Sequence, residues 1–216
     1  MANNTCPQCG APVPMRSGAM PYAVCGYCQT VIARDGMRDI GKAALLPYDI
    51  SPIQLGTGGA VDGARFTVVG RVRWGWADGA WNEWLLQLSD GSTRWLGEAM
   101  GQFQILAERE DLLERFGAFR VGDSMQVDGV TFIASDIKQV ECLGAEGDLP
   151  FPTPNDWRIE SVDFRSTTGA ALSVQRDGGR LSAYVGRYVE LAELRPSRLR
   201  AVEDWVIPDN LAETGR

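Results

Sequence analysis

The sequence predicts a mainly β protein, and three observations carry this prediction. Glycine accounts for 25 of the 216 residues, which suits a chain with many tight turns. Short runs of β-forming residues are separated by repeated Asp-Gly pairs, the preferred chemistry of β-hairpin turns. Two Cys-x2-Cys pairs stand near the N-terminus. We therefore expect a small ribbon followed by a β-sandwich or tandem small-barrel domain, built of two related antiparallel units with one short helix.

The two cysteine pairs have the spacing of a zinc ribbon. Fifteen residues separate the second cysteine of the first pair from the first cysteine of the second, and each pair can present two thiolates to one tetrahedral Zn²⁺. Gly10 and Gly26 are expected to permit the tight turns around the sulfur atoms. A site closed by four thiolates leaves no vacant position for a reacting water. Residues 1–44 are thus predicted to hold one structural zinc ion through Cys6, Cys9, Cys25 and Cys28.

Charge is unevenly distributed along the chain. The net charge is −7, yet residues 1–44 contain four basic and two acidic side chains, so the acidic excess lies in the remainder. Neither part has the basic surface that neutralises phosphates, and we expect nucleic acid to be an unlikely partner.

The sequence also bears on the compartment. No stretch approaches the roughly 20 apolar residues of a membrane helix, and the first residues lack a signal-peptide pattern, so we expect a cytoplasmic protein without direct membrane insertion. Four of the five cysteines have metal spacing, which suits a reducing compartment. The remaining one, Cys142, is expected to be a buried apolar residue rather than a reactive thiol.

An internal repeat follows a short linker at residues 46–52. The pattern G-x5-D-G-x2-F occurs at Gly56 and again at Gly122, a displacement of 66 residues. Each copy predicts a strand, an Asp-Gly turn and a return strand whose phenylalanine enters the core. Residues 53–146 would then contain two related β units. The alternative is that the two copies are unrelated examples of common hairpin chemistry.

Further elements follow from alternation and turn signals. A three-stranded meander is expected over 65–76, 81–88 and 93–96, and a helix over 108–116 because Leu112, Leu113 and Phe116 have helical spacing. Strands at 157–164, 170–175 and 181–194 would complete the same domain within residues 155–207, which end in a short C-terminal tail.

The meander predicts a face rich in tryptophan. If Asp78-Gly79 forms a two-residue turn, Trp76 pairs with Trp81 and Trp74 with Glu83, whereas Trp84, Leu86, Leu88 and Trp95 share the opposite, core face. Aromatic rings beside a carboxylate can bind a cation. The face formed by Trp74, Trp76, Trp81 and Glu83 is therefore a candidate site for a small cationic ligand. The alternative is that the tryptophans are core and that Glu83 pairs with Arg71, Arg73 or Arg94.

Several of these motifs together resemble a known family. They are Phe66-x-Val-Val-Gly-Arg71, Trp81-x-Glu83-Trp84, Asp90-Gly91-x3-Trp95-Leu96 and Glu146-Gly-Asp-Leu-Pro150. From about residue 53 to residue 194 the chain resembles the bacterial domain-of-unknown-function family 4178. The resemblance implies a bacterial multi-gene setting, near polyamine-synthesis-like enzymes and small membrane proteins, and an N-terminal zinc ribbon in some members. It implies no catalytic residues.

The function predicted first is that of a non-enzymatic, zinc-binding adaptor or interaction protein of a bacterial multi-gene system, with a protein partner. The chain has no histidine, which removes the usual general base near neutral pH and the usual third ligand of an open catalytic zinc. One alternative is a ligand-binding module that uses the tryptophan face for a small cation such as a polyamine. Another is an accessory subunit of a nucleic-acid or modification enzyme.

Overall fold

The computed structural model describes residues 4–203 and Leu211, and these residues form one continuous antiparallel sheet of 13 strands. The two short helical segments are both 3-10 helices. The strands are β1 (Tyr22–Val24), β2 (Thr30–Ala33), β3 (Arg38–Lys42), β4 (Gly58–Val61), β5 (Ala64–Trp76), β6 (Gly79–Leu88), β7 (Thr93–Ala99), β8 (Gln102–Glu108), β9 (Ser124–Val127), β10 (Val130–Leu149), β11 (Arg158–Arg165), β12 (Ala170–Asp177) and β13 (Arg180–Val189).

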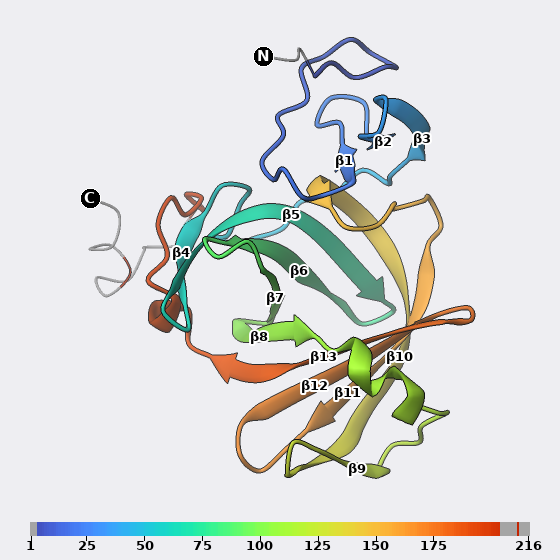
Figure 1. Cartoon of the computed structure of the whole chain (residues 1–216), viewed down its shortest axis with the longest axis vertical. Coiled ribbons are helices and arrows are strands. Elements are labelled where there is room, and N and C mark those ends of the chain that lie inside the picture. Colours follow the sequence, from blue (N-terminus) through green and yellow to red (C-terminus); the bar gives the residue numbers. More distant parts are fainter. Residues whose placement is uncertain (1–3, 204–210, 212–216) are drawn as a thin grey trace.

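Eight of these strands close into an antiparallel barrel. Strands β5 to β8 form one meander and β10 to β13 form another; β8 pairs with β13, and β5 pairs with β10. The first strands of the two meanders thus pair with each other, and so do the last strands. This is the mainly β fold that the sequence predicts, and its two units share one barrel. In Figure 1 the ribbon, in blue, lies at one end of the molecule, and β9 lies at the other.

The internal repeat is present in the backbone. Asp62 and Gly63 join β4 to β5 with φ of 49° and 84°, and Asp128 and Gly129 join β9 to β10 with φ of 51° and 80°. Positive φ at both central residues is the mark of the hairpin turn that Asp-Gly favours. The two phenylalanines of the repeat, Phe66 and Phe132, are both buried.

The repeat continues into the strands. Gly56 N–H donates to Val68 O at 2.8 Å, and Gly122 N–H donates to Ala134 O at the same distance. Each of these acceptors is followed by a β-bulge, at residue 69 in β5 and at residue 135 in β10. A bulge bends its strand and increases the local twist, which helps a sheet to close. Shared turns, hydrogen bonds and bulges show that the two units are structurally equivalent.

The predicted register of the tryptophan hairpin is wrong: the turn lies one residue earlier than predicted, so the partner of each strand residue differs by two. Trp76 pairs with Gly79, so the turn is Ala77-Asp78, and Trp74 pairs with Trp81. Gly79 permits this register because a Cβ there would lie 2.8 Å from the Trp76 ring, so the ring covers a position without a side chain. On the next strand pair the partner of Trp95 is Leu85 rather than Leu86. Trp95 consequently shares the inner face with Trp74, and the predicted assignment of Trp95 to the other face is wrong.

Both faces of the first meander are buried. Trp74, Leu85 and Trp95 point into the barrel, whereas Trp84 and Leu86 belong to a second core on its outer surface. That outer core is covered by the segment before β4 and by the 3-10 helix η2 (Leu191–Leu194), whereas η1 (Glu110–Arg115) lies over a third core on the second meander.

The helix predicted at 108–116 is a shorter 3-10 helix, η1, and the strand predicted at 181–194 ends at Val189. The predicted tail reaches residue 207, but residues 204–207 lie outside the described part of the chain.

The linker predicted at residues 46–52 has no regular secondary structure, but it is fixed to the barrel. The carboxylate of Asp49, 5% exposed, pairs with the guanidinium groups of Arg71, Arg73 and Arg200. The Asn82 amide also donates to Asp49 Oδ2 at 3.2 Å. Because all of these groups are largely desolvated, the linker is held in one position along the barrel wall.

Candidate functional site

The four N-terminal cysteines form a compact cluster. Their Sγ atoms all lie within 4.8 Å of one another, and Cys6 and Cys28, like Cys9 and Cys25, are separated by 3.7 Å between sulfur atoms. A Zn–S distance of about 2.3 Å in a tetrahedral site requires sulfur atoms about 3.8 Å apart. The cysteines therefore fit a four-coordinate zinc ion, which would crosslink the two knuckles.

The two knuckles have the same backbone. Gly10 N–H donates to Cys6 O and Gln29 N–H donates to Cys25 O, each at 2.9 Å, and both donors have positive φ. The prediction that Gly10 serves a tight turn is confirmed. The equivalent residue of the second knuckle is Gln29, with φ of 58°, so the expectation that Gly26 supplies this conformation is wrong. Thr30 Oγ1 lies 3.2 Å from Cys28 Sγ; this contact and the Thr30 backbone N–H, together with the neighbouring cysteines, lower the pKa of Cys28 to about 6, which favours the thiolate.

The ribbon and the barrel share hydrogen bonds. Strand β1 pairs with the end of β10, with Ala23 opposite Asp148. The Asp148 side chain is fully buried, and its Oδ2 accepts the N–H groups of Arg16 and Ser17 at 2.6 and 2.7 Å. Ser17 Oγ donates in turn to Gln87 Oε1 on β6 at 2.7 Å. The linker at residues 46–52 therefore separates the ribbon from the barrel along the sequence. In space the two are joined, because β1 of the ribbon is part of the same sheet as the barrel strands.

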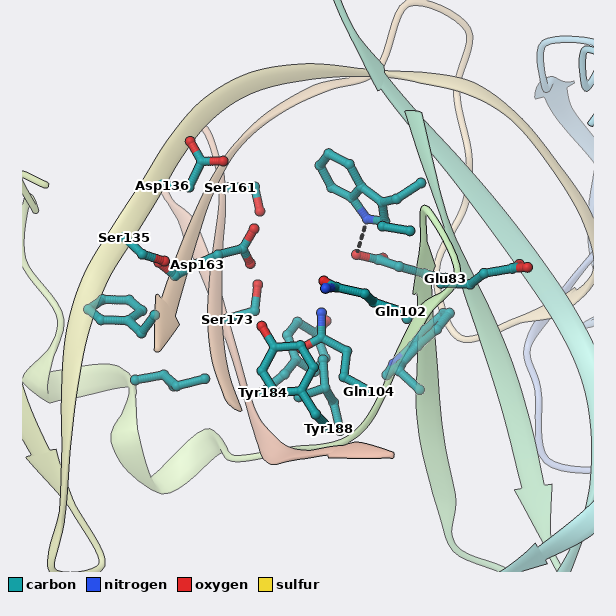
Figure 2. Close-up of a pocket in the computed structure, with 18 of the residues that line it drawn as sticks. Glu83, Gln102, Gln104, Ser135, Asp136, Ser161, Asp163, Ser173, Tyr184 and Tyr188 are labelled. Atoms are coloured by element: carbon teal, nitrogen blue, oxygen red, sulfur yellow. Dashed lines mark hydrogen bonds between the residues drawn. The ribbon is translucent and has the colours of Figure 1, made fainter. Parts of the chain in front are cut away.

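A cavity of about 260 Å³ occupies one end of the barrel interior. It extends to the β7–β8 turn, where Met100 is 97% exposed. Trp76, Trp81, Trp95, Tyr184 and Tyr188 supply its aromatic surface. Polar side chains on different strands converge on it: in Figure 2, Glu83, Gln102 and Gln104 lie on one side and Ser161, Asp163 and Ser173 on the other. The cavity is thus lined in part by aromatic side chains and in part by polar ones.

Glu83 is the most constrained of these polar groups. Trp74 Nε1 donates to its Oε2 at 2.9 Å, and its Oε1 accepts Trp81 Nε1 at 3.0 Å and Gln175 Nε2 at 2.7 Å. All three donors are neutral, and the ion pairs found among residues 4–203 do not include Glu83. Burial raises the pKa of Glu83, and the three hydrogen bonds only partly oppose this.

A second carboxyl group, Asp163, lies across the cavity from Glu83 (Figure 2). Burial raises the pKa of Asp163, whereas the Ser173 hydroxyl and the positive charges of Lys138 and Arg165 lower it. The negative charge of Asp163 in turn raises the pKa of Glu83, so the two groups interact through the cavity. Two carboxyl groups with raised pKa values in one cavity mark it as a place where positive charge would be stabilised.

The predicted face of Trp74, Trp76, Trp81 and Glu83 is present in the structure, and it faces the barrel interior. Trp76 and Trp81 line the cavity with Glu83, and their ring centroids are 5.6 Å apart. Trp74 lies beneath them, 1% exposed, and reaches the site through its hydrogen bond to Glu83.

The predicted ion pair between Glu83 and an arginine is wrong. Arg71 and Arg73 lie on the outer wall of the barrel and pair with Asp49, because alternation along β5 turns them away from Glu83. Arg94 Nη1 donates to the Thr93 carbonyl at 2.7 Å.

The sequence reasoning missed the half of the cavity that the second meander supplies. Asp136 and Lys138 come from β10, Asp163 from β11, Ser173 from β12 and Tyr184 from β13. The repeat could have indicated one of them. Its displacement of 66 residues makes Lys138 the counterpart of Val72, and Val72 is the cross-strand partner of Glu83. Cys142 is buried as predicted, and burial raises the pKa of its thiol to about 11.

A smaller cavity of about 200 Å³ occupies the other end of the lumen. Trp95, Gln175 and Tyr184 line both cavities and therefore form the layer between them. Phe151 stacks on Trp95 with ring centroids 5.8 Å apart, and its loop follows directly after β10. This end of the barrel is thus filled by aromatic side chains close to the strand that carries the ribbon.

Comparison with known proteins places the barrel in a family. None of the described helices has the length and apolar character needed to cross a membrane. Neither the curated proteins nor the solved structures gave a match to this chain. A family model described as a domain of unknown function, DUF4178, matches residues 54–191, which begin just before β4 and end just after β13. The matched segment is more than half of the chain and contains the whole barrel, and the protein belongs to the DUF4178 family.

Proposed function

We propose that the barrel is a non-catalytic binding module for a small cationic ligand, with an ammonium group held between Glu83 and Asp163. The observation that carries this proposal is Glu83, an acidic group in the barrel interior whose three hydrogen-bond donors are all neutral. A carboxylate without a counter-charge in such a place is costly, and a bound cation would offset that cost.

The walls of the cavity support the same ligand chemistry. Trp76, Trp81 and Tyr184 present aromatic surface beside the acidic groups, and a cation over such a ring gains about 0.5–2 kcal/mol depending on desolvation. The volume of about 260 Å³ lies just below the usual range for drug-sized ligands, about 300–1,000 Å³. A linear di- or polyamine has suitable charge and width, so putrescine and spermidine are the first ligands to test.

We expect putrescine to bind in the low millimolar range or tighter, and Glu83→Gln to weaken binding by about tenfold or more, which equals about 1.4 kcal/mol. Binding should also weaken as the pH falls, because protonation of Glu83 removes the charge that the ammonium needs. Burial raises the pKa of Glu83, so this loss should begin at a higher pH than for an ordinary glutamate. Isothermal titration calorimetry measures the affinity directly; Glu83→Gln alters the partners of two tryptophans, which makes fluorescence alone ambiguous.

Two controls sharpen this experiment. Glu141→Gln removes an equal charge from an exposed site on β10, where Glu141 pairs with Arg158, and should leave binding unchanged. 1,4-Butanediol matches putrescine in length but carries no charge, and it should not bind. Equal binding of the diol and the diamine, or an absence of saturable heat with putrescine and spermidine, would contradict the proposal.

A second proposal concerns docking to a protein partner, which is the adaptor function predicted first from the sequence. Four of the strongly exposed large apolar side chains lie in the ribbon and the linker: Tyr27 of the second knuckle at 74%, and Leu45, Tyr48 and Ile50 before β4 at 73%, 82% and 74%. Exposed apolar groups gathered on a short segment support a protein contact. Two of the ribbon's four basic groups are engaged within it, since Arg34 donates to the Met20 carbonyl at 2.8 Å and Arg38 pairs with Asp35 at 2.9 Å. This gives the nucleic-acid alternative little support.

The docking proposal predicts that a partner binds through these side chains. Affinity purification from the native cell, with mass spectrometry, should recover a partner with the wild-type chain and lose it with the triple substitution Leu45→Asp, Tyr48→Asp and Ile50→Asp. The triple variant must retain its zinc content and its thermal transition, because only then does the loss report on the surface. A partner retained by the folded variant would show that these side chains are not the docking site.

A further inference from the structure

The chain contains two lysines, Lys42 in the ribbon and Lys138 in the barrel, against 21 basic residues in total. Lys138 lies on β10 and lines the large cavity. Its Nζ lies 4.9 Å from the centroid of the Trp76 ring and forms an ion pair with Asp136. An alkylammonium of the protein itself is therefore placed on the aromatic and acidic wall of the proposed site.

The backbone explains why a cation is needed at this position. Asp136 and Asp163 are direct cross-strand partners on β10 and β11, and like charges placed opposite each other destabilise a sheet. The bulge at residue 135 precedes Asp136, and both Asp136 and Lys138 line the cavity. The Lys138 ammonium lies beside one of the two carboxyl groups and lowers the pKa of the other.

The Lys138 side chain is only loosely enclosed. It is 26% exposed, and its partner Asp136 is 46% exposed, so the pair lies toward the open part of the cavity. A long lysine stem has many rotamers, and an exchange of one ammonium for another leaves the number of cations on the wall unchanged. Displacement of Lys138 by an incoming amine is therefore a modest change for the barrel.

We infer that Lys138 is a tethered competitor: in the free protein its ammonium occupies the subsite formed by Trp76, Asp136 and Asp163, and a ligand ammonium takes its place beside Asp163 when the ligand binds between Asp163 and Glu83. The inference rests on the proposed cation-binding function and deepens it. It identifies the ligand as a primary alkylammonium compound, because the group already held there is one. It also makes Lys138 the residue that sets the affinity of the site.

Removing the competitor should strengthen binding. We expect Lys138→Met, which keeps the apolar stem and removes the charge, to bind putrescine about tenfold more tightly than the wild type. Arg165→Met is the matched control, because Arg165 also lines the cavity and acts on Asp163 through its charge, whereas Lys138 is the residue whose ammonium lies over the Trp76 ring. An equal gain in Arg165→Met would overturn the inference, since the effect would then reflect net charge alone.

A second measurement reports on Lys138 without any variant in the site. With ¹³C-lysine labelling the chain gives two Lys Cε–H signals, which Lys42→Arg assigns. In the free protein the Lys138 signal should be shifted upfield by the Trp76 ring, and saturation with putrescine should move it to the position of the exposed Lys42 signal. A Lys138 signal that stays in place while calorimetry records binding would overturn the displacement and leave the proposed function intact. An absence of putrescine binding by both the wild type and Lys138→Met would instead contradict the proposed function itself.

Discussion

Replacing Cys25 by serine is expected to abolish zinc binding, to unfold residues 1–44 and to lower the melting temperature of the barrel as well. Zinc binding by such modules is worth about 10–16 kcal/mol in isolated peptides and is inseparable from their folding. The barrel is affected because β1 pairs with β10 and because the buried carboxylate of Asp148 accepts the N–H groups of Arg16 and Ser17. Unfolding of the ribbon removes these donors and the strand opposite Asp148, so the end of β10 loses its hydrogen bonds and its packing on this side.

Zinc content by mass spectrometry and melting by calorimetry test this expectation together. Cys142→Ser is the control, because it alters a buried thiol outside the cluster and should retain the zinc. The wild type should show one zinc ion per chain, and Cys25→Ser none. An unchanged barrel transition in Cys25→Ser would show that the pairing of β1 with β10 contributes nothing measurable to the barrel.

Replacing Asp49 by asparagine is expected to destabilise the protein by about 3–5 kcal/mol, the usual cost of removing one partner from a buried ion network. Asp49 is 5% exposed and pairs with three guanidinium groups, those of Arg71, Arg73 and Arg200. The substitution leaves these positive charges close together, with Glu146, 3.4 Å from Arg71, as the remaining carboxylate partner. It should also release the linker and the segment around Arg200 from the barrel wall.

Urea denaturation followed by tryptophan fluorescence measures this loss. Asp35→Asn is the matched control, because Asp35 pairs with Arg38 at 2.9 Å but both side chains are mostly exposed, at 77% and 62%. Exposed pairs contribute about 0–1 kcal/mol, so the control should unfold almost as the wild type does. If Asp49→Asn also lowered the free energy of unfolding by only about 0–1 kcal/mol, the expected large effect would be contradicted, and water would have to reach the three guanidinium groups in the variant.

The local features of the fold could be predicted because each depends on a few adjacent residues. The spacing of the cysteines defines two knuckles, and Asp62-Gly63 and Asp128-Gly129 specify the same hairpin turn twice. The turn of the tryptophan hairpin was predicted at Asp78-Gly79 but lies one residue earlier, because packing of the Trp76 ring over Gly79 decides where the turn falls. The residue types at the turn do not predict this packing, which depends on the position of the Trp76 side chain.

The candidate site could be predicted only in part for a similar reason. Trp74, Trp81 and Glu83 are close in sequence, and alternation placed them on one surface. Whether that surface faced the lumen or the solvent depended on closure of the barrel through β5 and β10. The alternative partner of Glu83, an arginine of the same sheet, is excluded by alternation, since Val72 pairs with Glu83 and the neighbouring Arg71 and Arg73 point to the outer wall.

The sequence by itself determined the four-cysteine cluster of the ribbon, the two Asp-Gly hairpins and the tryptophan-rich character of the first meander, because these are carried by spacing and by local turn chemistry. The tertiary structure alone decided that the two units form one barrel and that Glu83 and Asp163 face each other across its interior. It also decided that Lys138 lies over Trp76 and that Asp148 joins the ribbon to the barrel. These last arrangements join residues that are far apart in the chain, and only closure of the sheet fixes the distances on which their chemistry depends.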